Sequence, residues 1–230
     1  MSLFAIGDTH LSFSSDKPMG IFPGWEDYEE RLEKNWNRVV GNDDTVVIAG
    51  DISWALKLED TLEDFRFIDS LNGKKIIMKG NHDYWWSTKT KAEKFFAENG
   101  IESISILFNN AFRVGDVSVC GTRGWFFDCE KSEDRRVLLR EAGRLRASVD
   151  RAKELGGEPV VFLHYPPVSL TQTCDEIYDI LVEEKISRCY YGHLHGDAVN
   201  WAYNGERDGV RFSLISADYL GFCPKLISKF

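Results

Sequence analysis

The sequence predicts an α/β fold in which mixed β-sheets are covered by helices. Short β-rich apolar runs alternate with segments of helical spacing, and the early runs lie far enough apart for crossover helices. Closer spacing at 104–121 and 188–215 predicts hairpins and some antiparallel pairing. The expected strands are Leu3–Ile6, Thr45–Ala49, Lys75–Met78, Val117–Cys120, Val160–Leu163, Arg188–Tyr191 and Arg211–Ile215.

Two segments have the apolar spacing of amphipathic helices. The apolar positions are Leu58, Leu62, Phe65 and Ile68 in the first, and Leu138, Ala142, Leu145, Val149 and Ala152 in the second. The second also carries arginines at 136, 140, 144 and 151. Because Glu141, Asp150 and Glu154 are interleaved with them, a solvated helix face is expected here and not a phosphate-binding stripe.

Length and composition bound the class of protein. A chain of 230 residues fits one domain, expected over 1–230, and no apolar run reaches the roughly 20 residues of a membrane span. The polar motif at Asp8 follows the first apolar run at once, which leaves no room for a secretion signal. Five widely spaced cysteines without a CxxC pair predict reduced thiols. A cytoplasmic location is therefore expected.

Five short motifs share one design, in which an apolar strand runs into side chains of metal-ligand type. Glycine precedes the ligand in four of the five, and glycine allows turns and close backbone approach. Because α/β sheets bind ligands at the carboxyl ends of their strands, the motifs are expected to converge there. They are Ile6-Gly7-Asp8-Thr9-His10, Ala49-Gly50-Asp51, Lys79-Gly80-Asn81-His82-Asp83, Leu163-His164 and Tyr191-Gly192-His193-Leu194-His195.

The ligand inventory predicts a centre of two metal ions. All five histidines of the chain lie in these motifs, which argues against a purely structural role. Imidazole, carboxylate and amide groups without thiolate favour Mn, Fe, Zn or Ni, divalent or trivalent. Seven candidates are too many for one tetrahedral ion and fit two ions that share a carboxylate. The candidates are Asp8, His10, Asp51, Asn81, His164, His193 and His195.

The motif order DxH, GD, GNHD, H, GHxH resembles that of the calcineurin-like metallophosphoesterase superfamily and spans residues 8–195. The resemblance implies an αββα sandwich and metal-dependent phosphoesterase activity. It also implies that Asp51 bridges the two ions. One ion would be held by Asp8, His10, Asp51 and His195, and the other by Asp51, Asn81, His164 and His193.

The resemblance also implies how such a site acts. Two ions roughly 3.5–4 Å apart hold a water, and the bridging hydroxide attacks phosphorus. His82 resembles the family histidine that faces the leaving-group oxygen, where it donates a proton or stabilises charge. Asp83 is expected to orient the His82 imidazole, so both residues are predicted to be catalytic.

Departures from the pattern of Ser/Thr protein phosphatases narrow the substrate. Asp51 is followed by Ile52-Ser53-Trp54-Ala55 in place of Val-Asp-Arg-Gly, and Asp83 stands where those enzymes carry Glu. The motifs instead resemble the branch that contains bacterial phosphodiesterases and small-molecule phosphohydrolases. A net charge of −9 disfavours long nucleic acids as partners. Hydrolysis of phosphomonoester or phosphodiester bonds in a small molecule, with nucleotides among the candidates, is the main expectation.

Two other classes of function stay open. One is a nuclease or a broad-specificity protein phosphatase, and the other is a catalytically silent module that binds metals. Residues 12–25 form a loop that is either a lid or a surface excursion. Arg123, beside Gly121 and Gly124, could contact a phosphate, but a solvated loop arginine is the expectation. Several aromatic residues could stack a nucleobase or pack in the core: Trp54, Tyr84, Trp85, Trp86, Trp125, Phe126 and Phe127.

Overall fold

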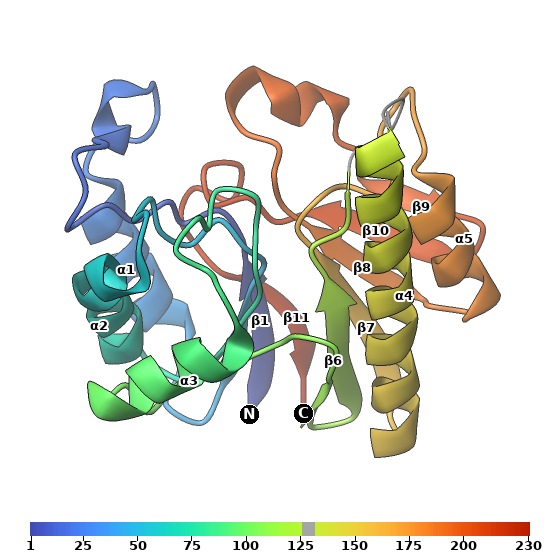
Figure 1. Ribbon diagram of the computed structural model, residues 1–230, viewed down its shortest axis with the longest axis horizontal. Helices are drawn as coiled ribbons and strands as arrows, with labels where there is room; N and C mark the ends of the chain where they lie inside the picture. The colour runs from blue at the N-terminus through green and yellow to red at the C-terminus, as the bar shows by residue number, and fades with distance from the viewer. Residues whose placement is uncertain (126–131) are drawn as a thin grey trace.

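Two β-sheets pack face to face between outer layers of helices in the computed structural model (Figure 1). The structure describes residues 1–125 and 132–230. Phe126 and Phe127, two of the aromatic residues singled out above, lie outside the described residues. The αββα sandwich of mixed sheets that the sequence and the family resemblance predict is confirmed.

The first sheet has the order β11-β1-β2-β3-β4. Strands β1 to β4 run parallel, and β11 pairs antiparallel with β1. The bounds are β1 Ser2–Ile6, β2 Thr45–Ile48, β3 Lys74–Ile77, β4 Ile104–Ile106 and β11 Lys225–Lys229. Because β1, β2 and β3 are parallel neighbours, the residues that follow their carboxyl ends emerge side by side.

The second sheet has the order β5-β6-β7-β8-β10-β9. Its central strands are parallel, with β5 and β9 antiparallel at the two edges. The bounds are β5 Phe112–Val114, β6 Val117–Thr122, β7 Glu158–Leu163, β8 Arg188–Tyr191, β9 Gly205–Arg207 and β10 Val210–Leu214.

Helices cover the outer face of each sheet. Helices α1 to α3 lie on the first sheet and α4 and α5 on the second, on opposite sides of the molecule in Figure 1. The bounds are α1 Tyr28–Val39, α2 Leu62–Ser70, α3 Lys89–Glu98, α4 Ser132–Leu155 and α5 Asp175–Glu183. Short 3₁₀ turns are η1 Met19–Ile21, η2 Leu58–Thr61 and η3 Gly196–Trp201. No helix in the described parts of the chain is long and apolar enough to span a membrane.

Successive side chains of a strand point to opposite faces of its sheet, and the buried ones form three apolar layers. In β2, Val46 and Ile48 face the helices α1 to α3, while Val47 belongs to the layer between the sheets. Leu3 of β1 and Phe162 of β7 meet in that central layer. Both faces of these strands are therefore buried, which explains why they read as continuous apolar runs and not as alternating ones.

All seven expected strands are present, with ends shifted by at most two residues. Some connections differ from the expectation. Over 104–121 the hairpin is β5–β6 alone, because β4 pairs in parallel with β3. Over 188–215 the hairpin is β9–β10, and β8 pairs in parallel with β10. Leu58 lies in the turn η2 and not in the following α-helix.

The expectation of a solvated face on the long helix α4 is wrong at Glu141. Arg136, Arg140 and Arg151 are exposed as expected. Glu141, in contrast, is 1% exposed and accepts a hydrogen bond from the Thr122 hydroxyl at 2.6 Å. The helix lies against β6 there, so this part of its charged face points into the protein.

Candidate metal centre

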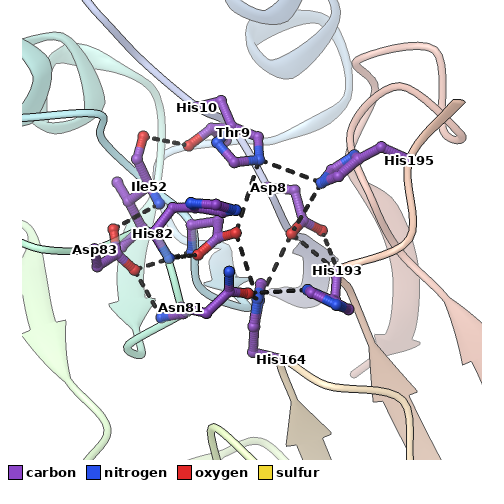
Figure 2. A network of polar contacts seen from close by, with 12 residues as sticks. Asp8, Thr9, His10, Ile52, Asn81, His82, Asp83, His164, His193 and His195 are labelled. Atoms are coloured by element: carbon purple, nitrogen blue, oxygen red, sulfur yellow. Dashed lines mark hydrogen bonds and ion pairs between the residues drawn. The ribbon is translucent and has the colours of Figure 1, made fainter. Parts of the chain in front are cut away.

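The candidate ligands all follow the carboxyl ends of parallel strands, where the two sheets meet. Asp8 and His10 follow β1, Asp51 follows β2, and Asn81 comes after β3. From the second sheet, His164 follows β7, and His193 and His195 come after β8. Figure 2 shows six of these side chains pointing toward one another, those of Asp8, His10, Asn81, His164, His193 and His195. The convergence that the sequence predicts is thus present, and neither sheet supplies the whole set.

Left-handed backbone directs several of these side chains inward. Asp8, His10, Asp51 and His193 have φ values of 59°, 45°, 49° and 74°. Such values are uncommon for residues other than glycine and persist only where surrounding contacts hold them. The Asp8 amide donates to the Gly50 carbonyl and the His10 amide to the Asp51 carbonyl, each at 2.9 Å. Strand-end loops therefore hold one another in the conformation that the site needs.

Three of the four glycines that precede ligands, Gly50, Gly80 and Gly192, are required by close packing. A Cβ atom on Gly80 would lie 2.1 Å from Asp51 Oδ1, and one on Gly192 would lie 2.4 Å from Asp8 Oδ2. Gly7 is different, because a Cβ there would meet only ordinary contacts at 3.5 Å or more. The glycine signal in the sequence therefore reports close approach of backbone to carboxylate at Gly80 and Gly192.

Asp8, His10 and His195 form one group whose ligand atoms lie within 4.8 Å of one another. The His10 and His195 Nε2 atoms are 3.2 Å apart, and Asp8 Oδ1 lies 3.4 Å from His195 Nε2. Burial alone would raise the pKa of Asp8, but His195, followed by His164, lowers it well below its ordinary value. Burial lowers the pKa of His10, so its imidazole is neutral and able to bind a cation.

Asp51, His164 and His193 form a second such group. The Asn81 Oδ1 atom joins it, at 2.6 Å from His164 Nε2 and 2.9 Å from His193 Nδ1. His164 Nδ1 lies 3.1 Å from the Ala49 carbonyl oxygen, to which only a protonated nitrogen can donate. That hydrogen bond leaves His164 Nε2 free for a metal. Burial lowers the pKa of His193 to about 3, which keeps it neutral as well.

Asp51 lies between the two groups. Its Oδ1 accepts from the His82 amide at 2.7 Å, whereas its Oδ2 is buried without a hydrogen-bond partner among the described residues. That Oδ2 atom is 3.8 Å from His10 Nε2 and 3.4 Å from His164 Nε2. Burial, then Asp83 and Asp8, raises the pKa of Asp51 to about 9. A cation beside Oδ2 would stabilise the ionised carboxylate and so oppose this rise in pKa.

The residues fit a pair of metal ions. Besides Asp51 Oδ2, the His10 Nδ1 atom is also buried and lacks a hydrogen-bond partner among the described residues. Such atoms are costly unless something satisfies them. The donor set of imidazole, carboxylate and amide suits transition-metal ions. Asp51 Oδ2 lies near a histidine of each group, 3.8 Å from His10 and 3.4 Å from His164.

Asp218 is a member of the site that the sequence reasoning missed. Its Oδ1 lies 3.1 Å from His195 Nδ1, and its Oδ2 accepts from the Gly196 amide at 2.9 Å. Burial opposes the charge on His195, but Asp8 and Asp218 prevail and raise its pKa to about 10. With Nδ1 directed at Asp218, His195 presents Nε2 to Asp8 and His10. A signal was present, because Asp218 also follows a strand end, that of β10.

His82 lies beside the two groups, and Figure 2 draws its ring between Asp83 and Asp8. Its ring centroid is 5.8 Å from that of His10 and 4.6 Å from that of Trp54. Burial lowers the pKa of His82, with His164 contributing next. The Tyr84 hydroxyl lies 3.4 Å from His82 Nδ1.

The expected contact between Asp83 and the His82 imidazole is wrong. Asp83 is fully buried, and its two oxygens accept from backbone amides of both strand-end loops and from the Trp85 indole. Burial raises the pKa of Asp83, while these donors oppose the rise. Asp83 therefore holds the loops after β2 and β3 together and positions His82 only through the backbone. The donors are Gly80 N, Asp51 N, Ile52 N, Ser53 N and Trp85 Nε1.

The aromatic residues divide between core and site. Trp85 and Trp86 are buried under the first sheet, so for these two the core-packing alternative is correct. Trp54 stacks on His10 with 4.8 Å between ring centroids, and Tyr84 is 55% exposed beside His82. For Trp54 and Tyr84, the alternative in which the aromatic ring lines the site fits better. Trp125 packs edge-on against Tyr165, whose ring lies 4.4 Å from that of His193.

The loop of residues 12–25 borders the site. Trp25 is 4% exposed and packs edge-on against His10 and His195, with 5.9 Å between ring centroids in both pairs. Lys17 of the same loop lies over the Trp54 ring. The loop is therefore more than a surface excursion. Together with the strand-end loops it encloses a pocket of about 440 Å³, lined by His10, Met19, Phe22, Pro23, Trp25, Trp54, His82, His195, Gly196 and Asp197.

Solved structures share this fold at low sequence identity. Phosphopantetheinyl hydrolase from Mycobacterium tuberculosis aligns with a TM-score of 0.58 and 14% identity, over 98% of this chain and 95% of that chain. A protein of unknown function from Aquifex aeolicus aligns with a TM-score of 0.55 and 16% identity, with the same coverage.

Sequence relatives match shorter stretches. An uncharacterized protein of Methanocaldococcus jannaschii is 30% identical over 86 residues, which are 35% of this chain and 46% of that protein. The Gene 66 protein of Mycobacterium phage L5 is 40% identical over 58 residues, or 25% of this chain and 28% of its own length. The chain thus matches less than half of either relative. The family model for calcineurin-like phosphoesterases matches residues 1–197, and the chain belongs to that family.

Proposed function

We propose that the protein hydrolyses phosphomonoester or phosphodiester bonds of a small molecule at a centre of two metal ions. The observation that carries this proposal is the buried Asp51 Oδ2 atom, which faces ligands of both groups without a hydrogen-bond partner of its own among the described residues. Family membership supports the reaction class. The proposed ligands are the seven predicted from the sequence, with Asp51 shared.

Catalysis would depend on the bound ions and on His82 as a proton donor. The bound ions would supply Lewis acidity toward the phosphoryl oxygens and a water of lowered pKa. His82 is not among the proposed ligands, and its ring lies beside those of His10 and Trp54. When the Tyr84 hydroxyl donates to His82 Nδ1, the proton of the neutral imidazole lies on Nε2. From Nε2 it can be given to the leaving-group oxygen.

The pocket beside His82 indicates the kind of leaving group. Its walls include Met19, Phe22, Trp25 and Trp54, so a planar or apolar group would bury apolar surface there. The phosphoryl group would lie at the ligand end of the pocket, against His10 and His195. An aryl group or a nucleobase fits these walls better than a sugar or glycerol does.

The test compares an aryl phosphate with an alkyl phosphate. Mn²⁺-loaded protein is expected to hydrolyse p-nitrophenyl phosphate or its bis diester, and to show a higher KM for glycerol phosphate. Phe22→Ala should raise KM for the aryl ester with little change in metal content, because Phe22 is a half-exposed wall residue and no ligand. Leu155→Ala, an exposed change at the far end of α4, is the matched control.

Two results would contradict the proposal. Fully metal-loaded protein that cleaves neither ester with Mn, Fe, Zn or Ni would instead favour the silent metal-binding module. Rapid, salt-sensitive cleavage of DNA or RNA with no activity on small esters would favour the nuclease.

A further inference from the structure

A second cavity, of about 280 Å³, opens between β3, β6 and α4, and it carries an excess of positive charge. Lys79, Arg123, Arg140 and Arg144 line it, and Glu141 is the only carboxylate among the described residues that line it. This cavity shares no lining residue with the pocket beside His82. Its charge is opposite in sign to the net charge of −9 of the whole chain.

Glu141 does not balance these cations. Its Oε1 is 2.6 Å from Arg144 and 3.8 Å from Arg123, and its Oε2 accepts from Thr122. Lys79 and Arg140 form no ion pair with any residue in the described ranges. The Arg123 Nε atom is buried and likewise lacks a hydrogen-bond partner there. Around this cavity the half-buried Lys79, the exposed Arg140 and the buried Arg123 Nε atom thus have no partner among the described residues.

Several other arginines of α4 form ion pairs with carboxylates. Arg146 pairs with Glu183 and Glu184, and Arg151 pairs with Glu154. Arg140 and Arg144 lie one helical turn apart on the cavity side, where like charges repel and lower helix stability slightly. Among the arginines in the described part of α4, Arg136 and Arg140 form no ion pair with another described residue, and of these two only Arg140 lines the cavity.

The walls add groups that suit an anion in a confined site. The Arg144 guanidinium lies over the Phe108 ring at 4.8 Å and that of Arg123 over the Trp125 ring at 4.5 Å. Stacking restricts the motion of both guanidinium groups, so less conformational entropy is lost when they bind an oxyanion. Ser87 and Asn109 also line the cavity and offer further hydrogen-bonding side chains.

We propose that this cavity is a second binding site, which takes a phosphate-type oxyanion independently of the metal centre. Lys79, Arg123, Arg140 and Arg144 supply the charge, and the oxyanion satisfies the donors that Glu141 leaves free. The anion is either free phosphate or a phosphate group attached to an organic molecule. Both present the same tetrahedral set of oxygens to the guanidinium groups of the arginines.

Side-chain NMR of arginine Nε–H groups tests the site directly. Full-length, Zn²⁺-loaded protein is titrated with inorganic phosphate, and the Arg123 and Arg144 signals should shift in a saturable way. Arg140→Gln should weaken this binding about tenfold, the usual effect of one charged hydrogen bond. Arg146→Gln removes the same charge from the opposite face of α4 and should leave the binding unchanged.

A parallel titration uses methylphosphonate, whose carbon–phosphorus bond mimics an attached phosphate group without being hydrolysed. Comparable shifts show that the oxyanion group alone is recognised, and shifts with inorganic phosphate only would identify free phosphate as the ligand. The proposal is overturned if Arg123 and Arg144 do not respond to either probe. It is also overturned if Arg140→Gln and Arg146→Gln bind phosphate equally well.

Discussion

Single residues explain how far the candidate site can be predicted. Asp8, Asp51 and His164 could be found from the sequence because each directly follows an apolar strand, in an order that resembles one family. Asp218 belongs to no motif of that order, although it completes the environment of His195. Asp83 was found but given the wrong contact, because hydrogen bonds to backbone amides across two loops have no sequence signature.

His82→Ala is expected to reduce turnover while both ions stay bound. Proton donation by a positioned side chain contributes about 10²–10⁴-fold, and its contribution grows with the basicity of the leaving group. The loss in kcat should therefore be larger for phenyl phosphate than for p-nitrophenyl phosphate. Steady-state kinetics on the two esters, with metal content measured in the same samples, checks this. Equal losses on both esters, or loss of metal, would show that His82 has another role.

Asp218→Asn is expected to weaken metal binding by about 10–100-fold, because carboxylate partners of ligating histidines orient the ring and raise its basicity. Competitive titration with a chelating dye measures the affinity. Asp197→Asn removes a nearby exposed carboxylate that has no hydrogen bond to His195, and it should leave the affinity close to that of the wild type. An equal effect of both variants would mean that overall charge matters and not the contact with His195.

At the scale of elements, long apolar runs were predictable and polar or short elements were not. Strands β2, β7 and β8 are buried on both faces, so composition alone identifies them. Strand β11 alternates between exposed and half-buried residues at the edge of its sheet, and its Leu-Ile pair is too short to stand out. The pairing of β4 with β3 depends on a crossover through α3, which local spacing cannot reveal.

Lys75 links two elements through an unusual buried charge. It lies in β3 with 1% exposure, and its Nζ donates to the Leu71 and Asp69 carbonyls at the end of α2 and to the Ser103 hydroxyl. Burial lowers the pKa of Lys75 from 10.5 to about 8. The folded protein therefore loses this proton at lower pH than the unfolded chain does. Between about pH 8 and 10.5 the unfolded state binds more protons, so this group's contribution to stability rises with pH.

Lys75→Met should consequently cost more stability at high pH than at neutral pH. The lost hydrogen bonds to buried acceptors cost on the order of 1–3 kcal/mol, and at pH 7 the removal of a buried charge offsets part of that cost. Urea unfolding of both proteins at pH 7 and pH 9.5 measures the difference. Lys74→Met, at the exposed neighbouring position, serves as the control and should show no such trend. A penalty that shrinks with rising pH would contradict the sign argued here.

At the scale of the whole molecule, the metal centre depends on the placement of one sheet against the other. Asp8, His10, Asp51 and Asn81 come from the first sheet, while His164, His193 and His195 come from the second. The central apolar layer holds the sheets in register, and Arg188 of β8 also donates to the Ile227 carbonyl of β11. Unfolding would separate the ligands, so bound metal should favour the folded state alone.

Metal binding should therefore stabilise the entire chain. At a free Mn²⁺ concentration 100 times the dissociation constant, linkage gives about 2.7 kcal/mol, which corresponds to a rise in Tm of about 5–10 °C for a chain of this size. Thermal melts with Mn²⁺ and with chelator measure this rise. His82→Ala should keep it in full, whereas Asp51→Asn should lose most of it, because Asp51 is the carboxylate placed between the two groups. A rise that survives in Asp51→Asn, or disappears in His82→Ala, would show that the ligand assignment is wrong even if hydrolysis is observed.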